Sequence, residues 1–144
     1  MPRSIPTAVT AELNLRMVID SERTIEVPCE WEYRSDEPYA VRATFRTGSA
    51  DIEWMFARDL ILEGMQRPSG EGDIVIWPEH HGSEPLIVVA LNSPTGQAVL
   101  ECDRDHLEQF MRCTFDIVAV GDEGDCLDID ATIHLILGGG LREV

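Results

Sequence analysis

Hydrophobic and polar residues alternate with a period of two over much of the first half of the chain. Every second residue is apolar in these stretches, and the residues between them are mostly charged or hydroxylated. Because successive side chains of a strand point to opposite faces, the pattern predicts half-buried β-strands. The segments are residues 11–19, 24–27, 39–45 and 52–56, with Trp31 and Tyr33 continuing one face after Pro28.

The chain between residues 73 and 102 is predicted to form three more strands. Asp73–Trp77 is a strand that we expect Pro78 to stop, and Glu79–Pro85 is predicted to be a polar loop. Leu86–Leu91 is apolar at every position, which is typical of a strand covered on both faces. The hairpin connection and the returning strand are residues 92–96 and 97–102.

Helical spacing replaces the alternation in three places. Residues 58–65 predict a short helix, and Asp105 with Glu108 matches a capping box at the start of a second one. Asp128 could cap a final helix that ends at Gly138. The apolar stripe of the second helix consists of Leu107, Phe110, Met111, Phe115 and Val118.

These elements predict an α+β fold. It would contain about seven or eight antiparallel strands, a short mid-chain helix, and two C-terminal amphipathic helices that lie across the sheet. The 144 residues suit a single domain spanning 1–144, with a core of about 11–137.

The charge of the chain narrows its partners. It has 27 acidic residues against 11 basic ones, all arginine, and a formal net charge of −16. Nucleic-acid binders place basic stripes against phosphates, and here the densest basic pair is Arg42 with Arg46. Anionic membrane surfaces are disfavoured for the same reason. We therefore expect partners that are proteins, small molecules or cations.

The N-terminus and the cysteines indicate a cytoplasmic protein. Residues 1–7 lack the apolar region of a signal peptide, and no apolar run approaches the length of a membrane span. No C-x-x-C spacing occurs among the four cysteines, which are Cys29, Cys102, Cys113 and Cys126. We expect them to be reduced thiols, some of them buried as small hydrophobic side chains.

The sequence predicts no catalytic residue, no cofactor and no metal site. His80 and His81 are adjacent, so on an extended chain they point to opposite faces and are poor ligands for one metal. The acidic stretch 122–130 fails the EF-hand pattern, because Gly124 and Leu127 occupy its third and sixth positions. No nucleophile elbow, P-loop or dinucleotide fingerprint occurs.

One long segment carries a more specific signal. Its motifs occur in a fixed order and spacing, and they closely resemble the SsgA-like family of sporulation and cell-division regulators from filamentous actinomycetes. The resemblance covers residues 11–137, is densest over 38–78, and within the family is strongest to SsgB-type members. The motifs are EPYAV (37–41), FRTG (45–48), WMFARDL (54–60), EG (63–64), PSGEGD (68–73) and IWP (76–78).

The resemblance implies a function and a fold. Its members are small acidic cytoplasmic proteins without known catalytic activity, which help to position and assemble the tubulin-like division ring at sporulation septa. The implied partners are the tubulin-like division GTPase and SsgA-type or membrane-associated division proteins. The implied fold is similar to that of the Whirly single-stranded-DNA-binding proteins, assembled as a homotrimer. Recruitment to the division septum would follow from these partners. The expectation of no nucleic-acid binding and no direct membrane insertion comes instead from the net charge and the short apolar runs.

The central motif predicts which side chains face outward. Trp54 and Phe56 share one face of their strand and are expected in the core, so Met55 would point to solvent or a neighbour. Trp77 would face opposite to Ile76, and core and interface both stay open for it. Asp59 could cap the following helix or pair with Arg58. The candidate partner-binding residues are Met55, Arg58, Trp77, Pro78, Arg42 and Arg46.

Two alternatives stay open from the sequence. The Whirly-like fold would suit a single-stranded nucleic-acid binder, with Arg42 and Arg46 as its local patch, although the net charge opposes this. A small-molecule enzyme would require Cys102 or Cys113 to meet a histidine in a pocket.

Overall fold

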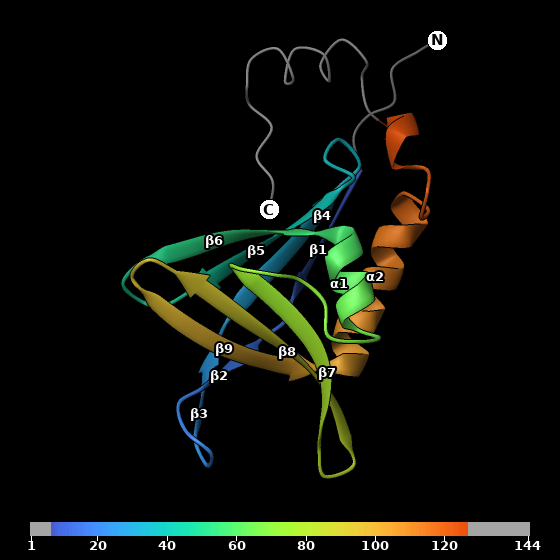
Figure 1. The fold of residues 1–144 in the computed structure, drawn as a ribbon. Helices are drawn as coiled ribbons and strands as arrows, with labels where there is room; N and C mark the ends of the chain where they lie inside the picture. The colour runs from blue at the N-terminus through green and yellow to red at the C-terminus, as the bar shows by residue number, and fades with distance from the viewer. Residues whose placement is uncertain (1–6, 127–144) are drawn as a thin grey trace.

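Two antiparallel sheets and two helices make up the part of the chain that the computed structural model describes, residues 7–126 (Figure 1). The first sheet has four strands in the order β1-β4-β5-β6, and the second has five in the order β3-β2-β9-β8-β7. The four-stranded sheet contains β1 (Ala8–Glu12), β4 (Cys29–Arg34), β5 (Ala40–Arg46) and β6 (Asp51–Ala57). The five-stranded sheet contains β2 (Leu15–Val18), β3 (Thr24–Val27), β7 (Ile74–His81), β8 (Glu84–Ser93) and β9 (Gly96–Asp103).

The helices lie at one end of the two sheets (Figure 1). They are α1 (Arg58–Gly64) and α2 (Arg104–Ile117), and the short 3₁₀ helix η1 (Glu123–Cys126) follows α2. Helix α1 contacts β6 and β7, whereas α2 contacts β1, β4, β8 and β9. The helices therefore connect the two sheets at this end.

One hydrophobic core lies between the inner faces of the sheets and under the helices. Trp31 of β4 is at its centre, stacked on Phe56 with ring centroids 5.7 Å apart and edge-on to Phe110 of α2 at 6.0 Å. Trp54 packs against this core from the same face as Phe56. The prediction that these two residues of the central motif belong to the core is confirmed.

The predicted fold class is confirmed, and its details need correction. The described residues contain nine strands rather than seven or eight. The single strand predicted over 11–19 is wrong, because the chain leaves one sheet after Glu12 and enters the other at Leu15. The alternation continues across this break because both sheets pack on one shared core, so every second side chain points to that core before and after the break.

Two further predictions about strand and helix ends are wrong. Strand β7 continues through Pro78 to His81, because β7 lies at the edge of its sheet, where a missing backbone donor is tolerated. The expected polar loop 79–85 is therefore mostly hairpin, with only residues 82–83 in its turn. Helix α2 begins at Arg104, and its start carries no side-chain cap. Glu108 instead bonds Arg112 at 2.9 Å.

Two predictions about apolar segments are confirmed. Residues Leu86 to Leu91 are all buried, as expected for a strand covered on both faces. The apolar stripe of α2 faces the core, with Phe115 only partly buried. The final helix predicted from Asp128 lies outside the described residues.

The close contact of α1 with β7 predicts an effect of a single methyl group. A Cβ at Gly64 would overlap the side chain of Ile76, which is itself buried. Gly64→Ala should therefore lower the free energy of unfolding by about 1–3 kcal/mol, measured by urea unfolding followed by circular dichroism. Gly96→Ala is the control, because its Cβ would meet nothing within 4 Å. Equal stability of the two variants would contradict this packing.

Candidate protein-interaction site

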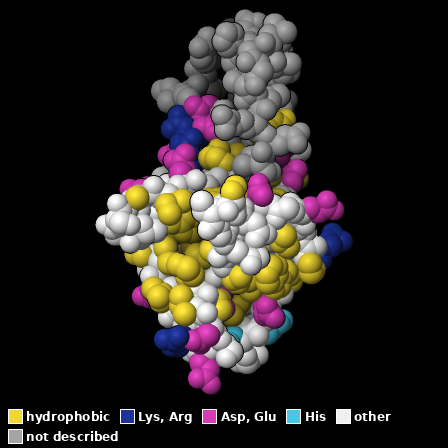
Figure 2. All heavy atoms as spheres, turned by 60° about the vertical axis from the view of Figure 1, so that its left-hand side comes forward, with side chains coloured by type: hydrophobic (Ala, Val, Ile, Leu, Met, Phe, Trp, Pro, Cys, Tyr) yellow, Lys and Arg dark blue, Asp and Glu magenta, His cyan; other side chains and the backbone are white. Residues whose placement is uncertain are grey.

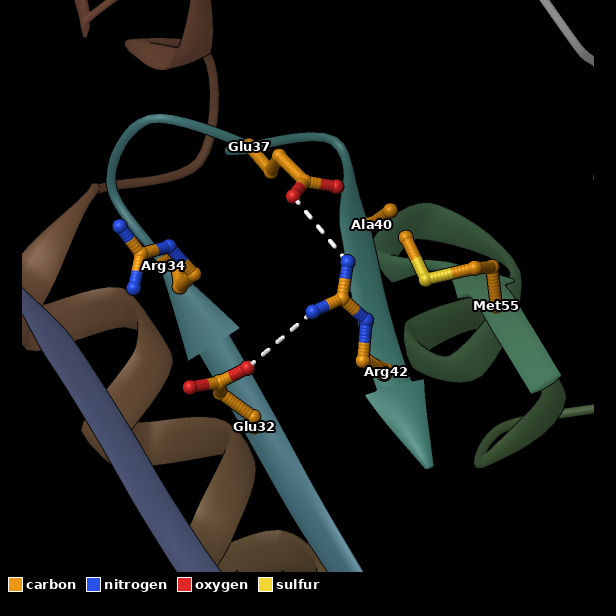
Figure 3. Close-up of a pocket in the computed structure, with 6 residues that line it drawn as sticks. All are labelled: Glu32, Arg34, Glu37, Ala40, Arg42 and Met55. Atoms are coloured by element: carbon orange, nitrogen blue, oxygen red, sulfur yellow. Dashed lines mark hydrogen bonds and ion pairs between the residues drawn. The ribbon is translucent and has the colours of Figure 1, made fainter. Parts of the chain in front are cut away.

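Arg42 lies on the outer face of the four-stranded sheet and is surrounded by carboxylates. Its Nη1 is 3.5 Å from Glu32 Oε1 and its Nη2 is 3.3 Å from Glu37 Oε1 (Figure 3). Its Nε is 3.4 Å from an oxygen of Glu53 on the neighbouring strand. One cation is thus shared by three acidic groups, and its charge is neutralised within the chain.

Met55 lies beside Arg42 in the same row of the sheet (Figure 3). Its side chain is half-buried and points away from the core, as the sequence predicts. The hollow between Met55, Arg42 and the neighbouring acids has a volume of about 10 Å³. This is room for about one water molecule, so the site offers no small-molecule pocket.

The other arginines are neutralised in the same way. Arg46 pairs with Glu12 at 3.0 Å and with Glu30 at 3.7 Å. Within residues 7–126, every arginine except Arg67 forms an ion pair with a carboxylate. The expected pair Arg42 and Arg46 is therefore no free basic patch, and the geometry opposes the nucleic-acid alternative.

Among the described residues, Arg58 is the one arginine whose side chain is fully buried, and only 1% of its surface is exposed. It is the first residue of α1, and its guanidinium reaches the far end of α2. Nη1 donates to the carbonyls of Thr114 at 3.2 Å and Val118 at 2.7 Å. Nη2 donates to the carboxylate of Glu123 at 2.9 Å.

Aromatic rings complete the surroundings of Arg58. The guanidinium carbon lies 4.9 Å from the ring centroids of both Tyr33 and Phe115. The expected roles of Asp59 are wrong, because α1 has no side-chain cap and Arg58 pairs with Glu123. Arg58 thus contacts groups of its own chain, and its buried side chain offers no surface to a partner.

Glu123 was not among the predicted functional residues. Its hydrogen bond from Arg58 holds the pKa of its carboxyl below the ordinary value of 4.5, and a backbone hydrogen bond acts in the same direction. Its other oxygen accepts from the Gly121 amide at 2.9 Å. Only the position of Arg58 could have indicated a buried acid, since residues 54, 56 and 58 share the inward face of one alternation.

Trp77 and Pro78 lie on the outer edge of the five-stranded sheet. Ile76 is 1% exposed in the core, and Trp77 points to the opposite face, as predicted. The indole Nε1 donates to Glu79 Oε2 at 2.9 Å. Trp77 is half-buried, so it belongs to the surface rather than to the core cluster.

The catalytic alternative finds no support in the geometry. Cys29 and Cys102 are buried free thiols, and burial raises the pKa of each to about 12, which disfavours the thiolate. Cys113 lines a groove with His106, but the two are seven residues apart on α2, a rise of about 10 Å. The side chain of Cys126 lies outside the described residues.

Residues 7–126 also bear on metal binding and on membrane insertion. No three side chains of metal-ligating type come together there in a way that could hold an ion. No helix in this part of the chain is both long and apolar enough to cross a membrane.

Sequence comparison defines the class of the protein. The sequence model described as "Streptomyces sporulation and cell division protein, SsgA" matches residues 27–123, so the chain belongs to the SsgA family. It is 42% identical to the sporulation-specific cell division protein SsgB of Streptomyces coelicolor, over 91% of this chain and 96% of that protein. SsgB of Thermobifida fusca is 38% identical over 88% and 93%. The predicted likeness to SsgB-type members is confirmed.

Solved structures agree. One structure comes from work on mutations in SsgB that correlate with longitudinal cell division during sporulation of Streptomyces coelicolor. Its TM-score to this chain is 0.83 at 41% sequence identity, and the match covers 87% of this chain and 99% of that one. An SsgA-like sporulation-specific cell division protein from Thermobifida fusca gives 0.82 at 37%, covering 92% and 98%. The chain is thus an SsgB-like, sporulation-specific cell division protein, and the prediction that it is no enzyme is in keeping with this class.

Substitution of Arg58 tests the role of the buried cation. Arg58→Met keeps much of the side-chain volume but leaves the carboxylate of Glu123 and the carbonyls at the end of α2 without their donor. The free energy of unfolding should fall by about 3–5 kcal/mol, measured by urea unfolding. Arg112→Met is the control, because that arginine is 75% exposed and its pair with Glu108 should contribute less than about 1 kcal/mol. Similar losses in both variants would contradict a structural role of Arg58.

Proposed function

We propose that the protein is a non-enzymatic cell-division regulator that helps to position and assemble the tubulin-like division ring at sporulation septa through protein–protein contacts. The observation that carries this proposal is the 42% identity, over nearly the whole chain, to a sporulation-specific cell division protein. A structure of the same family matches with a TM-score of 0.83. The proposed partners are the tubulin-like division GTPase and SsgA-type or membrane-associated division proteins.

The distribution of charge supports a protein partner. The net charge of −16 is unrelieved by free arginines in the described residues, since nearly all of them are ion-paired. A phosphate backbone or an anionic bilayer would be repelled, whereas a protein surface with basic and apolar groups would be attracted. The proposed location is therefore the cytoplasm, with recruitment to the septum through other proteins.

The surface residues proposed to contact partners lie on two separate faces. Met55, Arg42 and Arg46 lie on or beside the outer face of the four-stranded sheet, and Trp77 and Pro78 lie on β7. Trp77 and Met55 are side chains of the types that are enriched where interfaces bury the most surface.

A direct binding experiment tests the proposed partner. The full chain, immobilised through a terminal tag, should capture the purified tubulin-like division GTPase of the same organism, and should change its polymer yield in a GTP sedimentation assay. An unrelated protein of similar size and negative charge is the control for nonspecific electrostatics. The proposal would be contradicted if the chain did not capture the GTPase, did not change its polymer yield, and did not localise to septa in cells.

The oligomeric state is proposed to be a homotrimer, as the family resemblance implies. Each copy carries −16, so the contacts between copies must be apolar or paired through arginine to overcome repulsion. Light scattering of the full chain should give a mass of three 16.1 kDa chains, and high salt should strengthen the assembly by screening the repulsion. A monomer mass at all salt concentrations would contradict this.

A further inference from the structure

The outer faces of the two sheets differ in chemistry. On the four-stranded sheet, the outward rows are mainly charged or polar, and Met55 is their one large apolar side chain besides the small Ala8, Ala40 and Ala57. The charged or polar residues of these rows include Thr10, Glu12, Glu30, Glu32, Arg42, Thr44 and Glu53. On the five-stranded sheet, the outward face is mainly apolar in its middle. Its apolar residues are Val18, Val75, Trp77, Leu86, Val88, Ala90 and Val99.

Strand β8 shows this difference most clearly. Its inward residues Ile87, Val89 and Leu91 belong to the core cluster. The residues between them, Leu86 and Val88, are 3% and 4% exposed although they face away from that core. An antiparallel sheet with one free face alternates apolar and polar residues, and β8 does not. The outer face of β8 is therefore apolar, and side chains of the same chain already cover Leu86 and Val88. The apolar surface that stays accessible around them belongs to the half-buried Val18, Trp77 and Val99.

A groove of about 650 Å³ lies over this face, between the β2–β3 hairpin and the β7–β8 hairpin. Figure 1 shows both hairpins projecting at the same end of the molecule. Hydrophobic side chains gather in the middle of the side where β8 and β9 are joined, and charged groups surround them (Figure 2). The apolar residues that line the groove are Val18, Trp77, Leu86, Val88 and Val99. We call this surface the β8 groove.

The rim of the β8 groove is acidic. Its lining includes the five carboxylates of Asp20, Glu22, Glu79, Glu84 and Glu101, against two arginines and His81. Arg16 pairs with Glu101 and Asp103, and Arg23 pairs with Asp20, so these pairs also engage two of the five carboxylates. Among the described residues, no arginine pairs with the other three, Glu22, Glu79 and Glu84, and these give the rim its excess negative charge. An apolar floor with an acidic rim is complementary to an apolar stripe bordered by basic residues.

We propose that the β8 groove binds an amphipathic α-helix of a partner protein, with its apolar stripe on Trp77 and Val99 and with lysines or arginines facing the rim. The floor consists of side chains from strands whose backbone groups are bonded within the sheet. The ligand must therefore satisfy its own backbone, as a helix does. The inference rests on the proposed adaptor function and specifies the surface and the chemistry of the partner.

A second copy of this chain does not suit the groove. It would present the same acidic rim and another −16 of net charge to this surface. The homotrimer proposed above would accordingly use other surfaces. The proposal commits to a basic partner helix.

A fluorescence-anisotropy titration tests the proposal with the full chain. The probe is a labelled synthetic peptide of leucine, alanine and lysine, about 18 residues long, with its leucines at i, i+3, i+4 and i+7. A scrambled peptide of the same composition controls for attraction to the net charge. Val99→Arg places a cation on the groove floor, and Thr44→Arg makes the same charge change at a half-buried position on the other sheet.

The striped peptide should bind at least ten-fold more tightly than the scrambled one, and binding should weaken with salt. Val99→Arg should weaken binding of the striped peptide about ten-fold or more. Thr44→Arg should weaken it only slightly, through the added positive charge alone. Equal binding of both peptides, or equal loss in both variants, would overturn the proposal. So would the absence of binding by the full chain, or a change of subunit number in Val99→Arg by light scattering. If the peptide fails while the division GTPase is still captured, the adaptor function stands and this inference falls.

Discussion

The arrangement of the helices depends on the buried guanidinium of Arg58. A buried cation, here 1% exposed, needs hydrogen-bond acceptors, and the two Nη atoms of Arg58 find them at the end of α2 and in Glu123, 65 residues further along the chain. The junction of β6 and α1 is thereby joined to the segment that follows α2. Since α1 and α2 are held at this end of the sheets, neither of these two helices covers the outer face of a sheet.

This arrangement matters for function because the outer faces of the two sheets are not equivalent. The four-stranded sheet offers a network in which Arg42 serves three carboxylates, whereas the five-stranded sheet offers apolar side chains under an acidic rim. The chain has arginine but no lysine, and nearly all arginines of residues 7–126 form ion pairs with carboxylates of the same chain. What remains for a partner is negative charge and apolar surface, which favours protein recognition over nucleic acid.

Alternation along the chain was sufficient to predict most strands, because the inward side of a strand is a local property. The change of sheet between Glu12 and Leu15 could not be predicted, because the same alternating positions of the chain point to the core in both sheets and the pattern shows no break. The continuation of β7 beyond Pro78 required knowing that β7 is an edge strand. The family motif indicated Met55 and Trp77 as outward residues, but the partner of Arg58 is set by contacts distant in sequence.

A double-mutant cycle between Arg58 and Glu123 tests most directly whether this pair holds the helical end together. The free energies of unfolding of Arg58→Met, Glu123→Gln and the combined variant would be measured by urea unfolding under identical conditions. If the two side chains stabilise the fold through each other, the combined loss should be smaller than the sum of the single losses by about 0.5–3 kcal/mol. Losses that simply add would show that the pair is not the constraint on which the arrangement depends.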